Sequence, residues 1–323
     1  MYLEEVKITG FKSYATRTSI VFKPGIGVII GNNGVGKSNI LDAIAWALGE
    51  NDLTRLRCTA HDDLFFSGSP EYPPAATAMV ELSFRLGREK KAPGVKISRQ
   101  ADRQGNDRYL IDDREAPPPV YRAKKDELGI ADATKTLVRQ EQINDFLRLS
   151  PRERYLHLIS LLGRQEVGPD LAAGINDCFR RYFQTLIPEG EGKITLVDQD
   201  GTPGLVVEAA FPGKGMKNSL LLSGGEKTIC SLAANLAIFE QLRSPFYLLD
   251  EVEPSLDWIN HRHMQALFRK LAQSRQLVMI THLRSTIELA DTLHGIRARP
   301  DGTSFTKFYF EMNERLLRAY KCC

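Results

Sequence analysis

Hydrophobic and polar residues alternate along some stretches of the chain and recur at helical spacing along others. The alternating stretch MYLEEVKI and the segments TSIVF and GVII predict strands that lead into a glycine-rich loop. After that loop, apolar residues recur at helical spacing from Ser38, and Gly49 is placed to end the helix. The pattern therefore predicts a strand, a glycine loop and a helix in succession.

Further alternation predicts antiparallel strands beside this core. Five apolar residues from Ala78 to Leu86 fall on one face of a strand, and the segment VKISRQADRQGNDRYLIDD indicates a hairpin around Gly105. A polar helical stretch follows the proline run at 117–119. A capping box at Ser150–Glu153, with proline at the first helical position, then predicts a helix that ends at Gly163.

Residues 164–170 have linker composition, and we place an internal boundary there. An amphipathic helix is expected next, followed by strands in GKITLVDQD and GLVVEAAF, a helix from about Gly225, buried strands FYLLDE and QLVMITH with a helix between them, and a hairpin turned at 300–302. The chain is thus predicted to comprise an N-terminal half, 1–163, and a C-terminal half, 171–323.

Composition narrows the class of protein. With 323 residues and 42% hydrophobic content the chain can bury a full core, and its net charge of +3 neither requires nor excludes a nucleic-acid partner. No apolar run is long enough to span a bilayer and no secretory signal is present, so a cytoplasmic location is expected. The five cysteines lack metal-ligand spacing and are interpreted as structural thiols.

The glycine loop carries the first chemical motif. Gly31-x-x-x-x-Gly36-Lys37-Ser38 matches the P-loop pattern between a predicted strand and a predicted helix. Its backbone N–H groups would surround phosphates at a helix N-terminus, Lys37 would reach the β- and γ-phosphates, and the Ser38 hydroxyl would bind Mg²⁺. The alternative is a tight glycine turn in an unrelated fold.

The strand FYLLDE supplies the partner motif. It ends in Asp250 and Glu251, at the carboxyl edge where open α/β sheets bind ligands. Asp250 would bind Mg²⁺ and Glu251 would polarise the attacking water. A second anion-seeking loop, Ser223-Gly224-Gly225-Glu226-Lys227, leads into another helix. One phosphate site has no obvious use for two such loops. A second copy of the chain would give the second loop a use.

Together, GNNGVGKSN, SGGEK, LLDEVEPSLD and MITH resemble the ABC ATPases, whose signature serine and glycine contact the γ-phosphate held by the opposite subunit. The segments from ITGFKSY to LLG and from INDCFRRYF to ADTLHGI are similar to the two head segments of structural maintenance of chromosomes (SMC) proteins. This resemblance implies an α/β, ABC-type P-loop ATPase head, with a mixed or parallel sheet core flanked by helices and an antiparallel β subdomain. Both halves of the chain would form that one head.

The resemblance also assigns roles to residues. It makes Gln140 the Q-loop residue on Mg²⁺ and water, His282 the switch histidine, and Asp257 the residue at the dimer seam. Arg57 would lie near the phosphates, and Lys12 and Ser13 near the base. Catalysis would fall to Glu251, Gln140, Lys37 and His282, and metal binding to Ser38, Gln140 and Asp250. The nucleotide would be contacted by Lys12, Ser13, Asn32, Asn33, Gly34, Val35, Gly36, Lys37, Ser38, Asn39, Arg57, Ser223, Gly224, Gly225 and Asp257.

The residues themselves leave some alternatives open. His282 can also be an ordinary strand-end histidine, and Arg57 can belong to a solvated basic stretch. Gln142 competes with Gln140 for the Q-loop role. The P-loop has Asn32–Val35 where the family usually has Pro-Asn-Gly-Ser, and EPS precedes Leu256-Asp257 in place of Asp-Ala-Ala, which leaves the geometry of the dimer seam open.

The family's long coiled coil and hinge are missing, because only the short linker separates the two halves and no heptads are sustained. Either the coil has been replaced by this linker or the chain is naturally coil-less, and we favour the replacement. The expected function is an ATP-hydrolysing SMC head that dimerises around two ATP molecules in chromosome condensation and segregation.

Expected partners are a second head, a kleisin-type subunit and DNA, with no membrane and a nucleoid-associated location. A repair-type ABC ATPase head of the RecF/RecN or double-strand-break branch is the closer alternative. An ATP-gated dimerisation scaffold with little hydrolysis is another, and a transporter ATPase ranks last. DNA contacts would involve basic residues that can equally be solvated surface: Arg55, Arg57, Lys90, Lys91, Arg122, Lys124 and Lys125.

Overall fold

The computed structural model describes residues 1–87, 89, 91–199, 201–253 and 258–312, and the chain divides into two compact units. The first unit comprises Met1–Leu137, Ser244–Glu251 and Leu271–Cys323, and the second comprises Val138–Arg243 and Val252–Lys270. Each unit thus combines segments from both predicted halves of the chain. The prediction that the two halves form one head stays a prediction.

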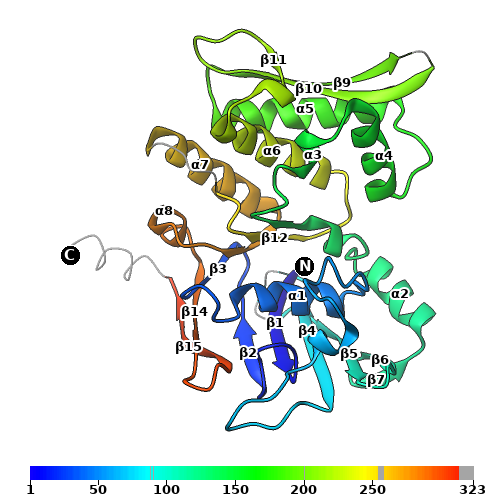
Figure 1. Ribbon diagram of the computed structural model, residues 1–323, viewed down its shortest axis with the longest axis vertical. Coiled ribbons are helices and arrows are strands. Elements are labelled where there is room, and N and C mark those ends of the chain that lie inside the picture. The colour runs from blue at the N-terminus through cyan, green and yellow to red at the C-terminus, as the bar shows by residue number, and fades with distance from the viewer. Residues whose placement is uncertain (88, 90, 200, 254–257, 313–323) are drawn as a thin grey trace. The chain divides into compact units, whose positions relative to one another are not determined.

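The first unit contains an antiparallel sheet with the strand order β2-β1-β4-β5-β6-β7 (Figure 1). Its strands are β1 (Tyr2–Thr9), β2 (Thr18–Val21), β4 (Thr77–Arg85), β5 (Gly94–Asp102), β6 (Asp107–Ile111) and β7 (Arg114–Ala116). The predicted strand and the hairpin around Gly105 are confirmed. Leu86 departs from the predicted face: it lies one residue beyond β4 and is 45% exposed, because the alternation continues past the point where strand pairing stops.

A second sheet in this unit is mixed. In it β12 (Phe246–Asp250), β13 (Gln276–Ile280), β3 (Ile26–Ile30) and β14 (Thr292–Ala298) run parallel to their neighbours, and β15 (Ser304–Glu311) closes an antiparallel hairpin with β14. Parallel strands end at the same edge of a sheet. The residues that follow β3, β12 and β13 therefore meet there.

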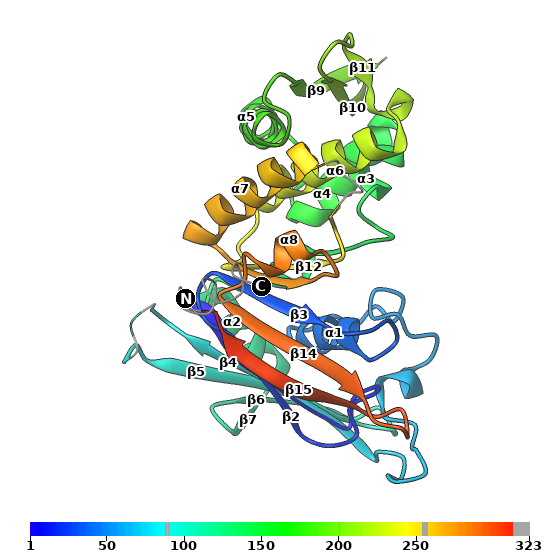
Figure 2. The same ribbon diagram turned by 90° about the vertical axis from the view of Figure 1, so that its left-hand side faces the viewer.

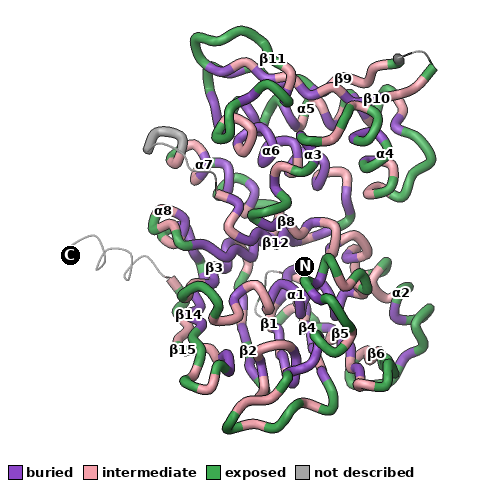
Figure 3. The backbone as a smooth tube through the Cα atoms, in the orientation of Figure 1, coloured by how far each residue is buried: buried purple, intermediate pink, exposed green. Residues whose placement is uncertain are grey.

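Helix α1 (Lys37–Ala47) contacts strands of both sheets (Figure 2). Its apolar residues belong to a buried cluster that also includes residues of β1, β4, β12 and β13, which gives the unit one continuous core (Figure 3). Helix α1 stops before Gly49, whose φ of 100° suits glycine, as the sequence predicted. The unit also contains η1 (His61–Leu64), α2 (Pro118–Glu127), η2 (Ala133–Thr136) and α8 (Arg284–Ile287).

In the second unit, helix α5 (Pro169–Leu186) contacts both α6 (Gly224–Phe239) and β9 (Glu191–Gln199). Strand β9 pairs with β10 (Thr202–Ala210), which also pairs with β11 (Lys217–Asn218). The remaining elements are α3 (Asp145–Arg148), α4 (Pro151–Leu162) and η3 (Ser219–Leu221), while the boundary between the units falls within β8 (Leu137–Arg139) and α7 (Trp258–Ser274).

The predicted ends of α4 are confirmed. Ser150 Oγ accepts a hydrogen bond from the Glu153 N–H, the Glu153 carboxylate accepts one from the Ser150 N–H, and Gly163 ends the helix in the left-handed conformation. None of the described helices is long and apolar enough to cross a bilayer.

Candidate functional site

The P-loop joins the end of β3 to the start of α1, as predicted. Gly34 and Gly36 have φ values of 79° and 92°, which glycine adopts without the steric cost that a side chain brings. Gly36 is the N-cap of α1 and no side chain caps the helix, so the first-turn N–H groups are not taken by a capping side chain. This is the backbone arrangement that binds anions at a helix N-terminus.

The Lys37 side chain is only 5% exposed and folds back over the loop. Its Nζ donates to the carbonyl oxygens of Gly31, at 2.8 Å, and Asn32, at 3.0 Å. Burial lowers the pKa of Lys37, while the nearby carboxylates of Glu251 and Asp250 oppose that shift. The ammonium is therefore held in the loop by two carbonyls and two neighbouring negative charges.

The two carboxylates lie where β12 ends. Asp250 is the last residue of β12, pairs in register with Ile280 of β13 and is largely buried. Glu251 has a φ of 52° and its N–H donates to the Ile280 carbonyl at 2.9 Å. A non-glycine residue in this left-handed region is uncommon and is held there by its surroundings. The turn directs the Glu251 side chain toward the P-loop.

His282 follows β13 by two residues and completes a cluster of three side chains. Its Nε2 lies 2.7 Å from Glu251 Oε1 and 3.2 Å from Lys37 Nζ, and Lys37 Nζ lies 3.9 Å from Glu251 Oε1. The structure thus brings together three predicted catalytic residues: Lys37 at the start of α1, and Glu251 and His282 just after the parallel strands β12 and β13. The fourth predicted catalytic residue, Gln140, belongs to the second unit.

A second cluster lies around Asp42, whose carboxylate is fully buried on α1. Asp42 Oδ2 is 2.6 Å from Lys12 Nζ and 2.7 Å from Arg57 Nη2. Arg57 also donates to Asn39 Oδ1 at 3.1 Å, and Asn39 Nδ2 donates to Ser13 Oγ at 2.8 Å. Four residues that were predicted to contact the nucleotide therefore share one hydrogen-bonded network. Lys12 and Arg57 both have positive φ, at 47° and 55°.

Two cavities border the P-loop residues. One of about 510 Å³ is lined by Lys12, Ser13, Asn39 and Arg57 on one side and by residues of the η1 region and the 301–302 turn on the other. The second, of about 340 Å³, includes Gly31, Asn32 and His282 together with residues of β14 and β15. The larger cavity is lined by two cationic groups, Lys12 and Arg57, and by the carboxyl groups of Asp62, Asp63 and Asp301, and its volume falls within the range of small-molecule sites.

In the second unit, the Ser223 loop is exposed at the start of α6. Ser223 Oγ and the Ser223 N–H donate to Glu226 Oε2 at 2.8 and 2.9 Å, and Glu226 pairs with Lys214 at 2.7 Å. The bond from Lys214 and those from Ser223 lower the pKa of Glu226 to about 2. Gly224 and Gly225 have open space around them, so the loop presents its backbone to the surface.

Three further predictions have mixed outcomes. Gln140 and its competitor Gln142 are both exposed in the segment after β8, so the choice between them stays open. Asp257 lies outside the described residues. Among the basic residues considered for DNA contact, Lys125 is partly buried, and its ammonium already donates a hydrogen bond to the Leu48 carbonyl at the end of α1.

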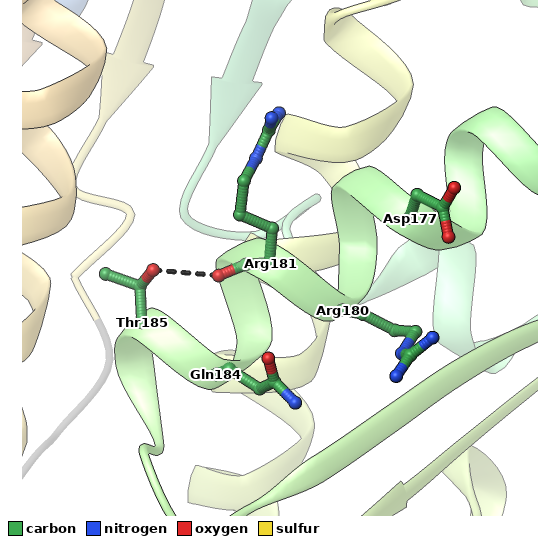
Figure 4. A pocket seen from close by; sticks show the side chains of 5 residues that line it. All are labelled: Asp177, Arg180, Arg181, Gln184 and Thr185. Carbon is green, nitrogen blue, oxygen red and sulfur yellow. Dashed lines mark hydrogen bonds between the residues drawn. The ribbon is translucent and has the colours of Figure 1, made fainter.

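The described surface also has a depression of about 440 Å³ along α5, away from any predicted site residue. Figure 4 shows its lining, in which Arg180 and Gln184 project from one helix and Thr185 Oγ1 donates to the Arg181 carbonyl at 2.8 Å. Its open, single-helix lining resembles an ordinary polar surface more than a built site.

Sequence reasoning missed three residues that shape these sites. Asp42 had a local signal, because it is the one charged residue among the apolar positions of the P-loop helix. Ser304 had none: from a strand far along the chain, its Oγ donates to the Val35 carbonyl at 2.8 Å and lies within hydrogen-bond distance of Ser13 Oγ, at 2.6 Å. Arg154 of α4 is fully buried, although its charge suggested solvent exposure.

Comparison with known proteins points to the same family as the sequence resemblance. A family model described as the RecF/RecN/SMC N-terminal domain matches residues 2–305. The chain belongs to this family. It is similar to the chromosome partition protein Smc of Mycobacterium tuberculosis, with 44% identity over 126 residues, which are 38% of this chain and 10% of that protein. The chain thus covers about a tenth of the length of the curated relatives it matches.

Solved structures identify the branch. One is an Smc head bound to the C-winged-helix domain of ScpA, with a TM-score of 0.85, 30% identity, and coverage of 97% of this chain and 99% of that one. Another is an Smc head with an extended coiled coil from Pyrococcus furiosus, bound to the C-terminal domain of ScpA, with a TM-score of 0.80, 25% identity and 99% and 98% coverage. The predicted ABC-type α/β fold and the SMC head resemblance are confirmed, and these matches favour the SMC branch over the repair-type alternatives.

Proposed function

We propose that this SMC head binds ATP with Mg²⁺, dimerises around two nucleotides and hydrolyses them. The observation that carries the proposal is the cluster of Lys37, Glu251 and His282, whose side chains lie within 4 Å of one another where the start of α1 meets the carboxyl ends of β12 and β13. A base, a cation for phosphate and a histidine that holds the base are the parts that phosphoryl transfer to water needs.

The residues present fit a nucleoside triphosphate. The positive φ at Gly34 and Gly36 and the free N-terminus of α1 suit a chain of phosphates, and Lys37 already lies in that loop. The larger cavity continues from Asn39 and Arg57 to Lys12 and Ser13. In our proposal, Arg57 lies by the phosphates and Lys12 and Ser13 lie by the base, as the SMC resemblance implies.

Ser38 at the start of α1 and the largely buried Asp250 would hold Mg²⁺, with Gln140 as a further ligand from the resemblance. A hydroxyl and a carboxylate are the oxygen ligands that Mg²⁺ prefers, and the ion usually keeps several waters. When bound, Mg²⁺ neutralises negative charge on the β- and γ-phosphate oxygens.

Hydrolysis is then assigned to this chain's own side chains. Glu251 accepts a proton from the attacking water and holds that water in line with the γ-phosphate, while His282 fixes the direction of the Glu251 carboxylate. Lys37 stabilises the charge that develops on the phosphoryl oxygens, and Gln140 helps to orient the water. Because Lys37, Glu251 and His282 already contact one another, little rearrangement of these three side chains is needed at the moment of reaction.

Partners follow from the exposed signature loop and from the relatives. Ser223, Gly224 and Gly225 would contact the γ-phosphate held by a second head, and Asp257 would lie at the seam. A kleisin-type subunit is proposed because the solved Smc heads are bound to ScpA. DNA contact, a role in chromosome condensation and segregation, and a cytoplasmic, nucleoid-associated location complete the proposal, supported by the name of the curated relatives.

The test is solution mass by light scattering for the wild type and Glu251→Gln, with and without ATP and Mg²⁺. A stable dimer of Glu251→Gln only with ATP is the expected result, because binding is kept and hydrolysis is blocked. Lys37→Ala in the same background is the control and should stay monomeric. A Glu251→Gln protein that stays monomeric with ATP shown to be bound would overturn the two-head mechanism.

A measurement of ATP turnover distinguishes an ATPase from a scaffold that only dimerises on binding ATP. Phosphate release from the wild type should exceed that from Glu251→Gln by about 10²-fold or more, since the variant lacks the general base. Equal and negligible phosphate release from both proteins, with ATP-dependent dimers from both, would support the scaffold.

A further inference from the structure

Arg154 of α4 is completely buried in the second unit and binds only neutral oxygens. Its Nε donates to the Phe146 carbonyl at 3.1 Å and its Nη1 to the Leu205 carbonyl at 3.2 Å. Its Nη2 donates to the Leu147 carbonyl at 2.7 Å and to Ser219 Oγ at 2.8 Å. A buried charge costs free energy unless such bonds satisfy it, so this arrangement must hold several segments at once.

The geometry of these bonds depends on arginine. The guanidinium is a rigid planar fork whose donors point in fixed directions, whereas a lysine ammonium is a single point charge on a flexible stem. Burial lowers the pKa of Arg154, in keeping with the absence of a carboxylate among its four acceptors. Holding a charge in this way is hard to explain by packing alone.

Three of the four acceptors connect the segment after Gln140 to the approach of the Ser223 loop, and the fourth, the Leu205 carbonyl, lies on β10. Phe146 and Leu147 belong to α3, which begins five residues after Gln140. Ser219 opens η3, and the signature serine, Ser223, follows four residues later. The Leu222 N–H donates back to the Ser219 carbonyl at 3.4 Å, so the path from Arg154 to the Ser223 loop is short and bonded.

A second tie joins the same two segments. Asn235 on α6 donates from Nδ2 to the Ile143 carbonyl, at 3.1 Å, just before α3. Helix α3 also contacts both α6 and η3. The segment after Gln140 is thus bonded to α6 through Asn235, and to η3, just before the Ser223 loop, through Arg154.

We propose that Arg154 is a positioning residue for head engagement: it fixes the Ser223 loop against the segment that follows Gln140, so that the loop is held in place to reach the nucleotide bound by a second head. This rests on the proposed ATP-dependent dimer and adds to it the residue that sets its signature loop. Removing the tie leaves the P-loop of the same chain intact. ATP binding to the single head is therefore kept, and dimer formation is weakened.

The test uses the full chain in the Glu251→Gln background. Ser219→Ala deletes one acceptor of Arg154 with little change in volume, and Arg154→Lys removes the fork. The matched control is Ser231→Ala, which alters a fully buried serine of α6 whose hydroxyl has no hydrogen-bond partner among the described residues. Dimerisation is measured by sedimentation or light scattering with ATP and Mg²⁺, at a temperature well below each protein's unfolding midpoint.

Ser219→Ala is expected to raise the dimer dissociation constant by about tenfold, because a lost hydrogen bond to a charged group has about that effect. ATP affinity, measured at protein concentrations where heads are single, should stay within about twofold of the parent, as should both quantities for Ser231→Ala. Arg154→Lys should have a larger effect in the same direction.

Three outcomes would each overturn the assignment, for different reasons. If Ser219→Ala lowers only the unfolding midpoint and dimerises as tightly as the parent, Arg154 is merely structural and the inference is wrong. If single-head ATP affinity falls in parallel with dimerisation, the residue does not act through the Ser223 loop. If the Glu251→Gln parent itself fails to dimerise with bound ATP, the proposed function fails first, and this inference falls with it.

Discussion

His282 Nε2 lies 2.7 Å from Glu251 Oε1, which places a histidine in hydrogen-bond contact with the residue proposed as general base. Glu251 leaves β12 in a left-handed conformation, with a φ of 52°, which points its side chain toward the P-loop but leaves the rotatable bonds before the carboxylate unrestrained. The contact with His282 supplies that restraint from the neighbouring strand. The direction of the base therefore depends on a residue 31 positions further along the chain.

The first prediction concerns this contact. His282→Ala should lower kcat for ATP hydrolysis by about 10²-fold, because the carboxylate of Glu251 loses its partner and its orientation. KM for ATP should change by less than about threefold, since Lys37 keeps its bonds to the P-loop carbonyls. Steady-state phosphate release checks both values.

His157→Ala is the control, since this histidine is exposed on α4 and forms part of no proposed site. It should leave kcat and KM unchanged. Equal kcat for His282→Ala and the wild type would mean that Glu251 is oriented without the histidine, and His282 would return to being an ordinary strand-end residue.

The second prediction concerns the P-loop backbone. Gly36→Ala should abolish measurable ATP binding, because Gly36 has a φ of 92° and its new Cβ would lie 2.3 Å from Ser304 Oγ and 2.5 Å from Ser13 Oγ. Moving Ser304 Oγ aside would break its hydrogen bond to the Val35 carbonyl of the P-loop. Calorimetric titration with ATP provides the measurement.

Gly105→Ala separates backbone strain from this clash. Gly105 has a similar φ of 88°, but a Cβ there meets nothing within 4 Å. The control should lose about 1–2 kcal/mol of stability from the left-handed backbone and bind ATP as the wild type does. Normal ATP binding by Gly36→Ala would show that the P-loop tolerates a side chain and that the Ser304 contact is not needed.

Local sequence signals predicted the parts of the site that lie within one segment. The P-loop, the carboxylates after FYLLD and the capped helix from Pro151 each follow from adjacent residues whose spacing dictates a local conformation. The place of His282 near the phosphate site was implied by the family resemblance. The shared edge of the parallel strands explains why the residues after β12 and β13 meet the P-loop there.

Long-range partners were beyond such reasoning. Ser304 touches the P-loop from a strand 269 positions away from Val35, and no local pattern marks that serine. Arg154 lies in a segment of charged residues, PRER, where exposure is the ordinary expectation, and only the tertiary structure shows its burial. Both are polar groups whose role is set by what packs against them.

The third prediction tests the cluster around Asp42. Asp42→Asn should lower stability by about 3 kcal/mol, because the carboxylate is fully buried and neutralises both Lys12 and Arg57, which would be left facing an uncharged amide. Urea unfolding followed by circular dichroism gives the change. The matched control is Asp113→Asn, which breaks an ion pair with Lys96 at a site where Asp113 is 67% exposed.

The control should cost no more than about 1 kcal/mol, as is usual for surface pairs. If both substitutions lowered stability equally little, other oxygens near Lys12 would be able to replace the Asp42 carboxylate. One such oxygen is the Leu56 carbonyl, which already accepts a hydrogen bond from the Lys12 ammonium.

A buried histidine makes the free energy of unfolding depend on pH. His294 of β14 is 1% exposed, its Nε2 lies 2.8 Å from the Val21 carbonyl, and its ring packs between Phe22 and Tyr309. Burial lowers the pKa of His294 to about 4, against the smaller opposite effect of the bond to Val21. The folded protein therefore keeps this imidazole neutral at pH values where the unfolded chain already protonates it.

The fourth prediction follows from that difference. Because the folded pKa is below the unfolded value of 6.5, the contribution of His294 is complete above pH 6.5 and is lost as pH falls toward 4. Between pH 7 and pH 4 the free energy of unfolding of the wild type should fall by about 3 kcal/mol more than that of His294→Phe, which keeps an aromatic ring between Phe22 and Tyr309 but cannot titrate. Urea unfolding at both pH values measures each protein, and the carboxylates common to both cancel in the comparison. Parallel losses in the two proteins would mean that His294 is protonated without unfolding, through an opening of the β14–β15 hairpin to water.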